Sequence, residues 1–210
     1  YTDDTKANEA LTKVGNLQTD VTELGESFDT LTNTTLPALS DGIITTSEKE
    51  NIRQALMQVQ KECVDVINAY TNLTVNYKSI YDKIAADVRT NFATAYTQLM
   101  GSATLSSDGT ITYTSGQGGA YGALVDNINA LLNKEGNLTT NEIATINNNI
   151  ANFNIKYNDF QNCLVVVRND IEKTLDTRIT DVDEKLGGYA YLKKIVGGKT
   201  TIDGGLVLTT

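Results

Sequence analysis

The sequence of 210 residues contains no histidine and no tryptophan, only one proline and only two cysteines. Histidine titrates near neutral pH and is the most frequent general base and metal ligand. Its absence excludes histidine-based catalytic triads, histidine-activated cysteine nucleophiles and ordinary zinc sites. No other pair of nucleophile and base is recognisable in the sequence, so we expect a protein that is not an enzyme and holds no cofactor.

The two cysteines, Cys63 and Cys163, lie far apart in the sequence. Each falls within an apolar pattern of helical spacing, which is typical of small buried hydrophobic side chains. Spacing alone does not determine whether two cysteines pair. A disulfide between the two helices therefore stays open as an alternative.

Basic residues are few, and long apolar runs are absent. The chain carries 17 Lys and Arg against 26 Asp and Glu, a net charge of −9. Binding to nucleic-acid phosphates needs clustered Lys and Arg, and no cluster is present, so nucleic acid is not expected as a partner. No segment approaches the roughly 20 consecutive apolar residues of a membrane-spanning helix, and no signal peptide is visible.

What the chain does have is a regular heptad repeat near its start. Apolar residues recur at alternating steps of three and four over about four heptads, which is typical of helices that bury a seam in a coiled coil. We therefore predict a coiled-coil helix over residues 3–32, after which residues 32–37 break the pattern. The predicted oligomer seam, for which a trimer is the first expectation, consists of Val14, Leu17, Val21, Leu24, Phe28 and Leu31.

The middle of the chain shows three further apolar patterns of helical spacing. They predict helices from about residue 47 to 70, from 77 to 99 with a stop at Gly101, and from 124 to 132. Between the second and third of these, Asp108-Gly109 is flanked by β-branched residues. This arrangement predicts a β-hairpin over about residues 103–114 with a type I′ turn. The hairpin is also a candidate for a surface contact, although a loop without function explains it equally well.

A very long helix is predicted from Thr140 to Gly187. At 1.5 Å per residue it would span roughly 70 Å, so it must emerge from a compact domain of this size. We expect its far end to join a coiled coil or to lie beside the first helix. Two successive four-residue steps follow Ile171, and such a discontinuity locally unwinds a supercoil.

The end of the chain has a different composition. Gly187-Gly188 is expected to end the long helix, and residues 189–210 suit short strands and turns. The first residue is Tyr1 and not Met, and residues 206–210 alternate like an interrupted strand. We therefore expect the chain to be an internal piece of a longer protein.

One turn motif occurs twice, at residues 41–48 and 135–142. Both copies read acidic, Gly, any residue, apolar, Thr, Thr, polar, Glu, and both precede an amphipathic helix. Thr followed three residues later by Glu is a capping box, and Gly allows the bend before it. The motif also matches the second half of an EF-hand calcium loop, but the leading carboxylates are missing. We therefore interpret the four acidic residues as structural and not as metal ligands: Asp41, Glu48, Glu135 and Glu142.

Four segments of the chain carry a resemblance to a known family. They are the start at residues 1–4, the turn at residues 41–49, its second copy, and the closing segment 191–210. The closing segment contains the sequence Gly-Lys-Thr-Thr-Ile-Asp-Gly-Gly-Leu. With these segments the chain resembles tail-fibre or tail-tip structural proteins encoded by bacteriophages and prophages of gut bacteria. The resemblance implies a virion-structural role, often in trimers, and transfers no catalytic residue. The hairpin at residues 103–114 departs from the simpler helical modules of that family.

We predict a mainly α fold, in which long coiled-coil helices flank a helical-hairpin bundle with a small β-hairpin and a Gly-rich, β-like tail. The expected division is a coiled-coil helix at 1–35, a bundle at 36–175, and an exit segment and junction at 176–210. The expected function is a spacer or stalk of a phage tail fibre or tail tip, located in the virion. Expected partners are further copies of the chain, other tail proteins and a bacterial surface receptor or glycan. The alternative is a bacterial cell-surface adhesin or receptor-binding stalk.

Overall fold

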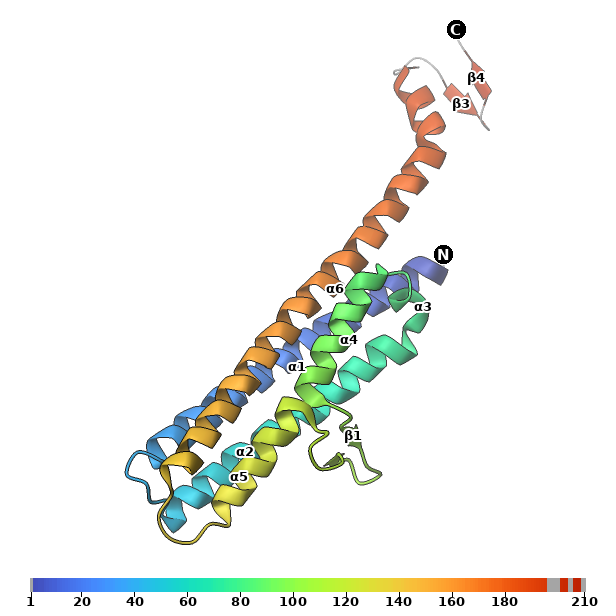
Figure 1. Cartoon of the computed structure of the whole chain (residues 1–210). Coiled ribbons are helices and arrows are strands. Elements are labelled where there is room, and N and C mark those ends of the chain that lie inside the picture. The colour runs from blue at the N-terminus through green and yellow to red at the C-terminus, as the bar shows by residue number, and fades with distance from the viewer. Residues whose placement is uncertain (1, 196–200, 204–205, 209–210) are drawn as a thin grey trace.

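The computed structural model describes the backbone of residues 2–195, 201–203 and 206–208, and the side chains of residues 5–175. The protein is mainly helical, as predicted. Its long helices form four antiparallel layers of an elongated bundle (Figure 1). The layers are α1 (Thr2–Ala38), α2 (Thr46–Thr71), α4 (Ala86–Met100) followed by α5 (Gly119–Leu132), and α6 (Thr140–Ile195). None of the described helices combines the length and the apolar character needed to cross a membrane.

The heptad residues of α1 are buried inside this bundle. All six residues of the predicted oligomer seam are at most 3% exposed within the single chain. The Phe28 ring packs against Phe153 of α6 at a centroid distance of 4.5 Å, and the Tyr157 hydroxyl donates to the Val21 carbonyl at 2.7 Å. α2 and α6 of the same chain therefore fill the seam, and its assignment to an oligomer interface is corrected. α1 is a layer of the bundle and not a separate domain.

The end of α1 lies later than expected, because the helix continues past Pro37 to Ala38. A proline inside a helix removes one N–H donor and crowds the carbonyl four residues before it. Here the ring lies in the last turn, and the helix ends one residue after it. The Leu39 N–H still donates to the carbonyls of Thr35 and Leu36, each at 3.2 Å.

The helix predicted at residues 77–99 is broken in the structure. α2 runs directly into a π-helical turn, η1 (Asn72–Asn76), followed by the short α3 (Lys78–Tyr81) and then α4. The Tyr77 N–H donates to the Asn72 carbonyl at 3.1 Å, and the Asp170 carboxylate of α6 accepts from the Ala85 N–H at 2.9 Å. The long-range bond stabilises a turn that the apolar spacing does not reveal. The end of α4 at Gly101, where φ is +60°, is as predicted.

The predicted hairpin is present, with a different turn. β1 (Thr104–Leu105) pairs antiparallel with β2 (Ile111–Thr112), so that five residues connect the strands. A type I′ turn needs positive φ at both central residues. In this loop only Gly109 has positive φ, at +82°. The Asp108 carboxylate instead accepts from the Thr110 N–H at 3.0 Å and stabilises the longer loop.

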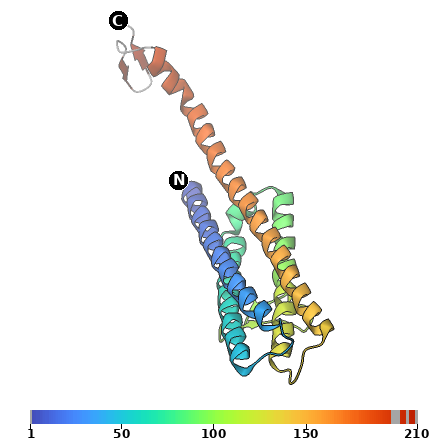
Figure 2. The ribbon, with the colours of Figure 1, turned by 90° about the vertical axis from the view of Figure 1, so that its left-hand side faces the viewer.

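α6 begins at Thr140 as predicted but continues through Gly187 and Gly188 to Ile195. A glycine inside a helix costs only about 1 kcal/mol relative to alanine, so two of them do not end a long helix. In both views α6 runs on past the bundle (Figures 1 and 2). Strands are present in the tail, where β3 (Thr201–Asp203) pairs antiparallel with β4 (Leu206–Leu208). The predicted apolar stripe from Ile179 to Leu186 belongs to residues whose side chains the structure does not describe.

Candidate functional site

The two copies of the turn motif meet at the end of the bundle away from the N-terminus. Both glycines have positive φ, +75° at Gly42 and +80° at Gly136. The Leu138 N–H donates to the Gly42 carbonyl at 2.7 Å, which joins the two turns directly. Lys49 adds a second link by donating from Nζ to the Lys134 carbonyl at 2.6 Å. The repeat therefore closes the bundle by linking the α1–α2 connection to the α5–α6 connection.

The acidic residues of the first turn are occupied by hydrogen bonds. Thr45 and Glu48 form the predicted capping box, in which the Glu48 N–H donates to the Thr45 hydroxyl and the Thr45 N–H donates to the Glu48 carboxylate at 2.8 Å. The Asp41 carboxylate accepts from the Ile43 N–H at 3.0 Å. These carboxylates satisfy donors of the turn and of the helix start, as a capping interpretation requires.

The second turn uses its acidic residues differently. The Glu142 N–H donates to the Thr139 hydroxyl at 3.1 Å, while the Glu142 carboxylate forms an ion pair with Lys134 at 2.5 Å. The hydrogen bond from Lys134 holds the pKa of Glu142 below its usual range. Glu135 is exposed in the turn. In the part of the chain that the structure describes, no group of three or more Cys, Asp or Glu residues is placed to hold a metal ion.

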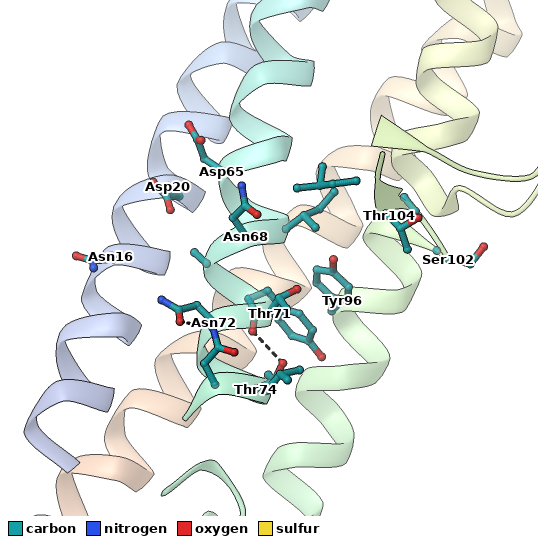
Figure 3. Close-up of a pocket in the computed structure, with 18 residues that line it drawn as sticks. Asn16, Asp20, Asp65, Asn68, Thr71, Asn72, Thr74, Tyr96, Ser102 and Thr104 are labelled. Atoms are coloured by element: carbon teal, nitrogen blue, oxygen red, sulfur yellow. Dashed lines mark hydrogen bonds between the residues drawn. The ribbon is translucent and has the colours of Figure 1, made fainter. Parts of the chain in front are cut away.

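A groove of about 1030 Å³ lies between α1, α2, η1 and the start of the hairpin (Figure 3). We call it the polar groove, since most of its lining residues carry an amide, hydroxyl or carboxyl group, although most of its exposed lining area is apolar. None of its lining residues is Lys or Arg. The labelled polar residues in Figure 3 are Asn16, Asp20, Asp65, Asn68, Thr71, Asn72, Thr74, Tyr96, Ser102 and Thr104.

Two carboxylates lie next to each other at one side of the polar groove, Asp20 from α1 and Asp65 from α2 (Figure 3). Partial burial raises the pKa of Asp20 to about 6, and the negative charges of Asp65, Glu23 and Glu62 add to the effect. The groove is therefore a region of negative potential, which disfavours anionic ligands such as phosphates.

Two stacked tyrosine rings belong to the lining of the polar groove. The rings of Tyr70 and Tyr96 stack at a centroid distance of 3.6 Å and an interplanar angle of 2°, and both lie close to Phe160. Burial raises the pKa of Tyr96 to about 12. Next to this stack, the Asn76 amide donates to Asn72 at 2.8 Å within the π-helical turn. π-helical turns occur frequently at functional sites.

The side chains that line the polar groove offer hydrogen-bond donors and acceptors to a ligand. Side-chain amides both donate and accept hydrogen bonds, hydroxyls do the same, and ionised carboxylates accept them. A neutral ligand rich in hydroxyl groups matches this lining. The sequence interpretation missed the groove, although a signal exists in Asp65, Asn68 and Asn72, which recur at helical spacing on the second helix. In the sequence alone, this polar stripe looks like an ordinary solvent-exposed helix face. Only the positions of α1 and the hairpin beside it reveal a groove.

The remaining predicted features do not join the polar groove into a larger site. Cys63 is buried in the core and Cys163 is half-buried, and both are free thiols, so the structure contains no disulfide between them. Hydrogen bonds from Ser106 and Thr110 lower the pKa of Asp108 at the hairpin tip to about 2. This network shapes the exposed loop and involves no residue of the groove.

Comparisons of the chain with family models, with curated proteins and with solved structures found no match. The residues of the chain and their geometry are therefore the basis on which a function is assigned.

Proposed function

We propose that the protein is a non-enzymatic structural module of a bacteriophage tail fibre or tail tip. The observation that carries this proposal is α6, a single helix of 56 residues with a length of about 84 Å at 1.5 Å per residue. It forms one layer of the bundle and then continues beyond it (Figure 1). A rod of this kind suits a mechanical role better than catalysis. The resemblance of the turn at residues 41–49 and of the closing segment to tail proteins supports the same role.

The path of the chain refines this proposal. α1 starts, and α6 leaves, at the same end of the bundle, while the two linked turns lie at the opposite end (Figures 1 and 2). A segment that separates two parts in line needs its entry and exit at opposite ends. The bundle is therefore a lobe held on the α6 stem, and the spacer function belongs to the stem. Other tail proteins are the partners that a stem of this kind would contact.

A bacterial cell-surface adhesin is the second candidate, and the polar groove favours it. Its neutral amides and hydroxyls, its two carboxylates and its lack of basic residues suit the hydroxyl groups of a saccharide. The same groove would serve attachment to a host surface if the protein is part of a virion. The two candidates therefore differ in location and not in the chemistry of the groove.

The location is tested on purified phage particles from bacteria that carry the coding DNA. We expect peptides from residues 5–175 in the mass spectra of the particles, and gold-labelled antibodies against the purified chain on the tail in electron micrographs. Peptides found only in the bacterial envelope fraction would favour the adhesin. Peptides found only in the remaining cell contents would contradict both candidates.

Saccharide binding is tested on a glycan array with the purified chain. The double variant Asp65→Ala/Asn68→Ala removes two polar side chains of the groove. Asn158→Ala is the matched control, because this exposed residue lies on α6 and not in the groove. We expect binding that the double variant loses and the control keeps. Absence of binding by the unmodified chain would restrict the protein to the mechanical role.

A further inference from the structure

We propose that the part of α6 beyond the bundle is a self-association stem, through which copies of the chain associate in parallel. The stem segment consists of residues 175–189 of α6. This inference concerns contacts between copies of the chain and does not depend on where the protein works. It moves the association surface from α1, where the heptad residues are buried internally, to a different helix.

The apolar contacts of the bundle end where the stem begins. Ala7, Ala10 and Ile80 form a small buried cluster at this end of the bundle, and Leu175 packs against it. The next residue of the α1 heptad pattern, four positions before Ala7, is Asp3. A charged residue at this position ends the apolar seam on α1. The described part of α1 therefore offers no apolar continuation to a partner helix beyond Leu175.

The apolar pattern of α6 continues past this point. Within the bundle, Leu164, Val167 and Ile171 are buried and follow steps of three and four. Two successive four-residue steps then lead to a new heptad register, in which steps of four and three alternate. A shift of this type changes the direction of the apolar stripe relative to the bundle. The stripe in the new register consists of Leu175, Ile179, Val182, Leu186 and Tyr189.

The backbone of α6 runs alone along this stretch in both views (Figures 1 and 2). With Ile179 and Leu186 at position a and Val182 at position d, the register is that of a coiled coil. Burying such a stripe against a neighbouring helix is the driving force of coiled-coil assembly. A second copy of the chain supplies a helix with the same register and the same length.

The charged residues that flank the stripe favour a parallel arrangement. Arg178 takes position g and Asp183 takes position e of the following heptad, and these two positions face each other between parallel helices. In an antiparallel arrangement, e positions face e positions and g positions face g positions. Asp176 would then face Asp183, and Arg178 would face Lys185, so like charges would meet. Opposite charges meet only in the parallel arrangement.

The first test is the mass of the full chain by sedimentation equilibrium, over a concentration series up to about 1 mM, because two heptads associate weakly. The variant Ile179→Asp/Leu186→Asp places charges in the stripe. The control Thr177→Asp/Thr180→Asp adds the same two charges at the outer positions f and b. We expect the unmodified chain and the control to associate and the stripe variant to stay monomeric, with unchanged thermal unfolding of the bundle in all three.

A monomeric unmodified chain over the whole series would overturn the proposal. Equal loss of association in both variants would also overturn it, since charge repulsion and not the stripe would then be responsible. The mass of the chain bears only on self-association, whereas the composition of phage particles bears only on the proposed function. A monomeric chain would therefore not contradict the proposed function, and absence of the chain from phage particles would not contradict self-association.

The second test determines the direction of the helices by disulfide trapping. Cys163→Ser serves as the background, because Cys63 is buried at 0% exposure and does not react. Leu186→Cys places a thiol in the stripe, and Glu184→Cys places one at the outer position f. Parallel, in-register helices bring the two copies of residue 186 within disulfide reach. We expect rapid cross-linking at 186 and little at 184, and equal cross-linking at both positions would contradict a parallel stem.

Discussion

At the scale of single residues, two glycines of α1 have opposite surroundings. Tyr157 lies directly over Gly25, where an added Cβ would come within 2.9 Å of the Tyr157 ring carbon Cζ. No atom lies within 4 Å of the corresponding position at Gly15. Gly25 therefore permits the close approach that lets the Tyr157 hydroxyl reach the Val21 carbonyl. Gly15 has no such role and only lowers the helix propensity of α1.

This difference predicts opposite effects of the same substitution. Gly15→Ala should stabilise the fold by up to about 1 kcal/mol, since alanine is the better helix former. Gly25→Ala should destabilise it by about 1–3 kcal/mol, because the added methyl group displaces the tyrosine ring. Urea unfolding followed by circular dichroism measures both values. A stabilising effect of Gly25→Ala would contradict the packing of Tyr157 against α1.

Asp20 makes the stability of the protein depend on pH. Its pKa is raised from 3.8 to about 6 in the folded state, chiefly by burial and then by the charge of Asp65. The folded state therefore binds more protons than the unfolded state between about pH 4 and pH 6. Asp20 contributes its stabilising effect below pH 4, and this effect is lost as the pH rises through 6.

Asp20→Asn removes this dependence. Because the carboxyl group is only partly buried, screening by solvent limits the expected gain at pH 7 to about 0.5–1 kcal/mol. The gain should disappear below about pH 4, where Asp20 is protonated in both states. Urea midpoints between pH 3.5 and 7.5 measure it. Asp159→Asn, at an exposed site on α6, reports the general effect of removing one negative charge, and an equal gain there would refute a specific effect at Asp20.

At the scale of elements, the starts of α2 and α6 depend on local side chains. Thr45→Ala removes the hydroxyl that accepts from the Glu48 N–H and should cost about 1 kcal/mol of stability. Thr45→Ser should retain most of it. Thr46→Ala changes the neighbouring exposed threonine, which makes no cap, and serves as the control. Thermal unfolding compares the three, and an equal loss in the control would show that the capping box contributes little.

Local patterns predicted the elements best where a few neighbouring residues decide the outcome. The capping box at Thr45, the stop at Gly101 and the hairpin around Gly109 all depend on contacts within a few positions. The break between α2 and α4 depends instead on Asp170, which is distant in the sequence and accepts from the Ala85 N–H. Apolar spacing contains no information about such a contact. The predicted end of α6 at Gly187 was wrong because a doubled glycine weakens a helix without ending it.

At the scale of the whole molecule, one hydrophobic core joins the helices of the bundle. A continuous cluster of buried apolar side chains includes residues of α1, α2, α4, α5 and α6. No layer buries its apolar face without its neighbours, so none is expected to unfold alone.

We therefore expect a single unfolding transition of the bundle. Near-ultraviolet dichroism of the buried tyrosines and calorimetry should give the same midpoint, with calorimetric and van't Hoff enthalpies in a ratio of about 1. Leu24→Ala should lower stability by about 2–5 kcal/mol in both measurements, because Leu24 is fully buried in the α1 seam. Two separated transitions, or an effect of Leu24→Ala on only one of them, would show that the layers unfold independently.

The sequence by itself determined that the chain is helical, where most helices start, and which residues are apolar enough to be buried. Val14, Leu17, Val21 and Leu24 occupy a helix seam because their spacing matches the period of the helix, whatever lies opposite them. Only the tertiary structure decided that α2 and α6 of the same chain lie there. A seam needs an apolar partner, and periodicity does not distinguish a neighbouring helix from a neighbouring chain. The polar groove also depends on the tertiary structure, since it exists only where α1, α2 and the hairpin are brought together.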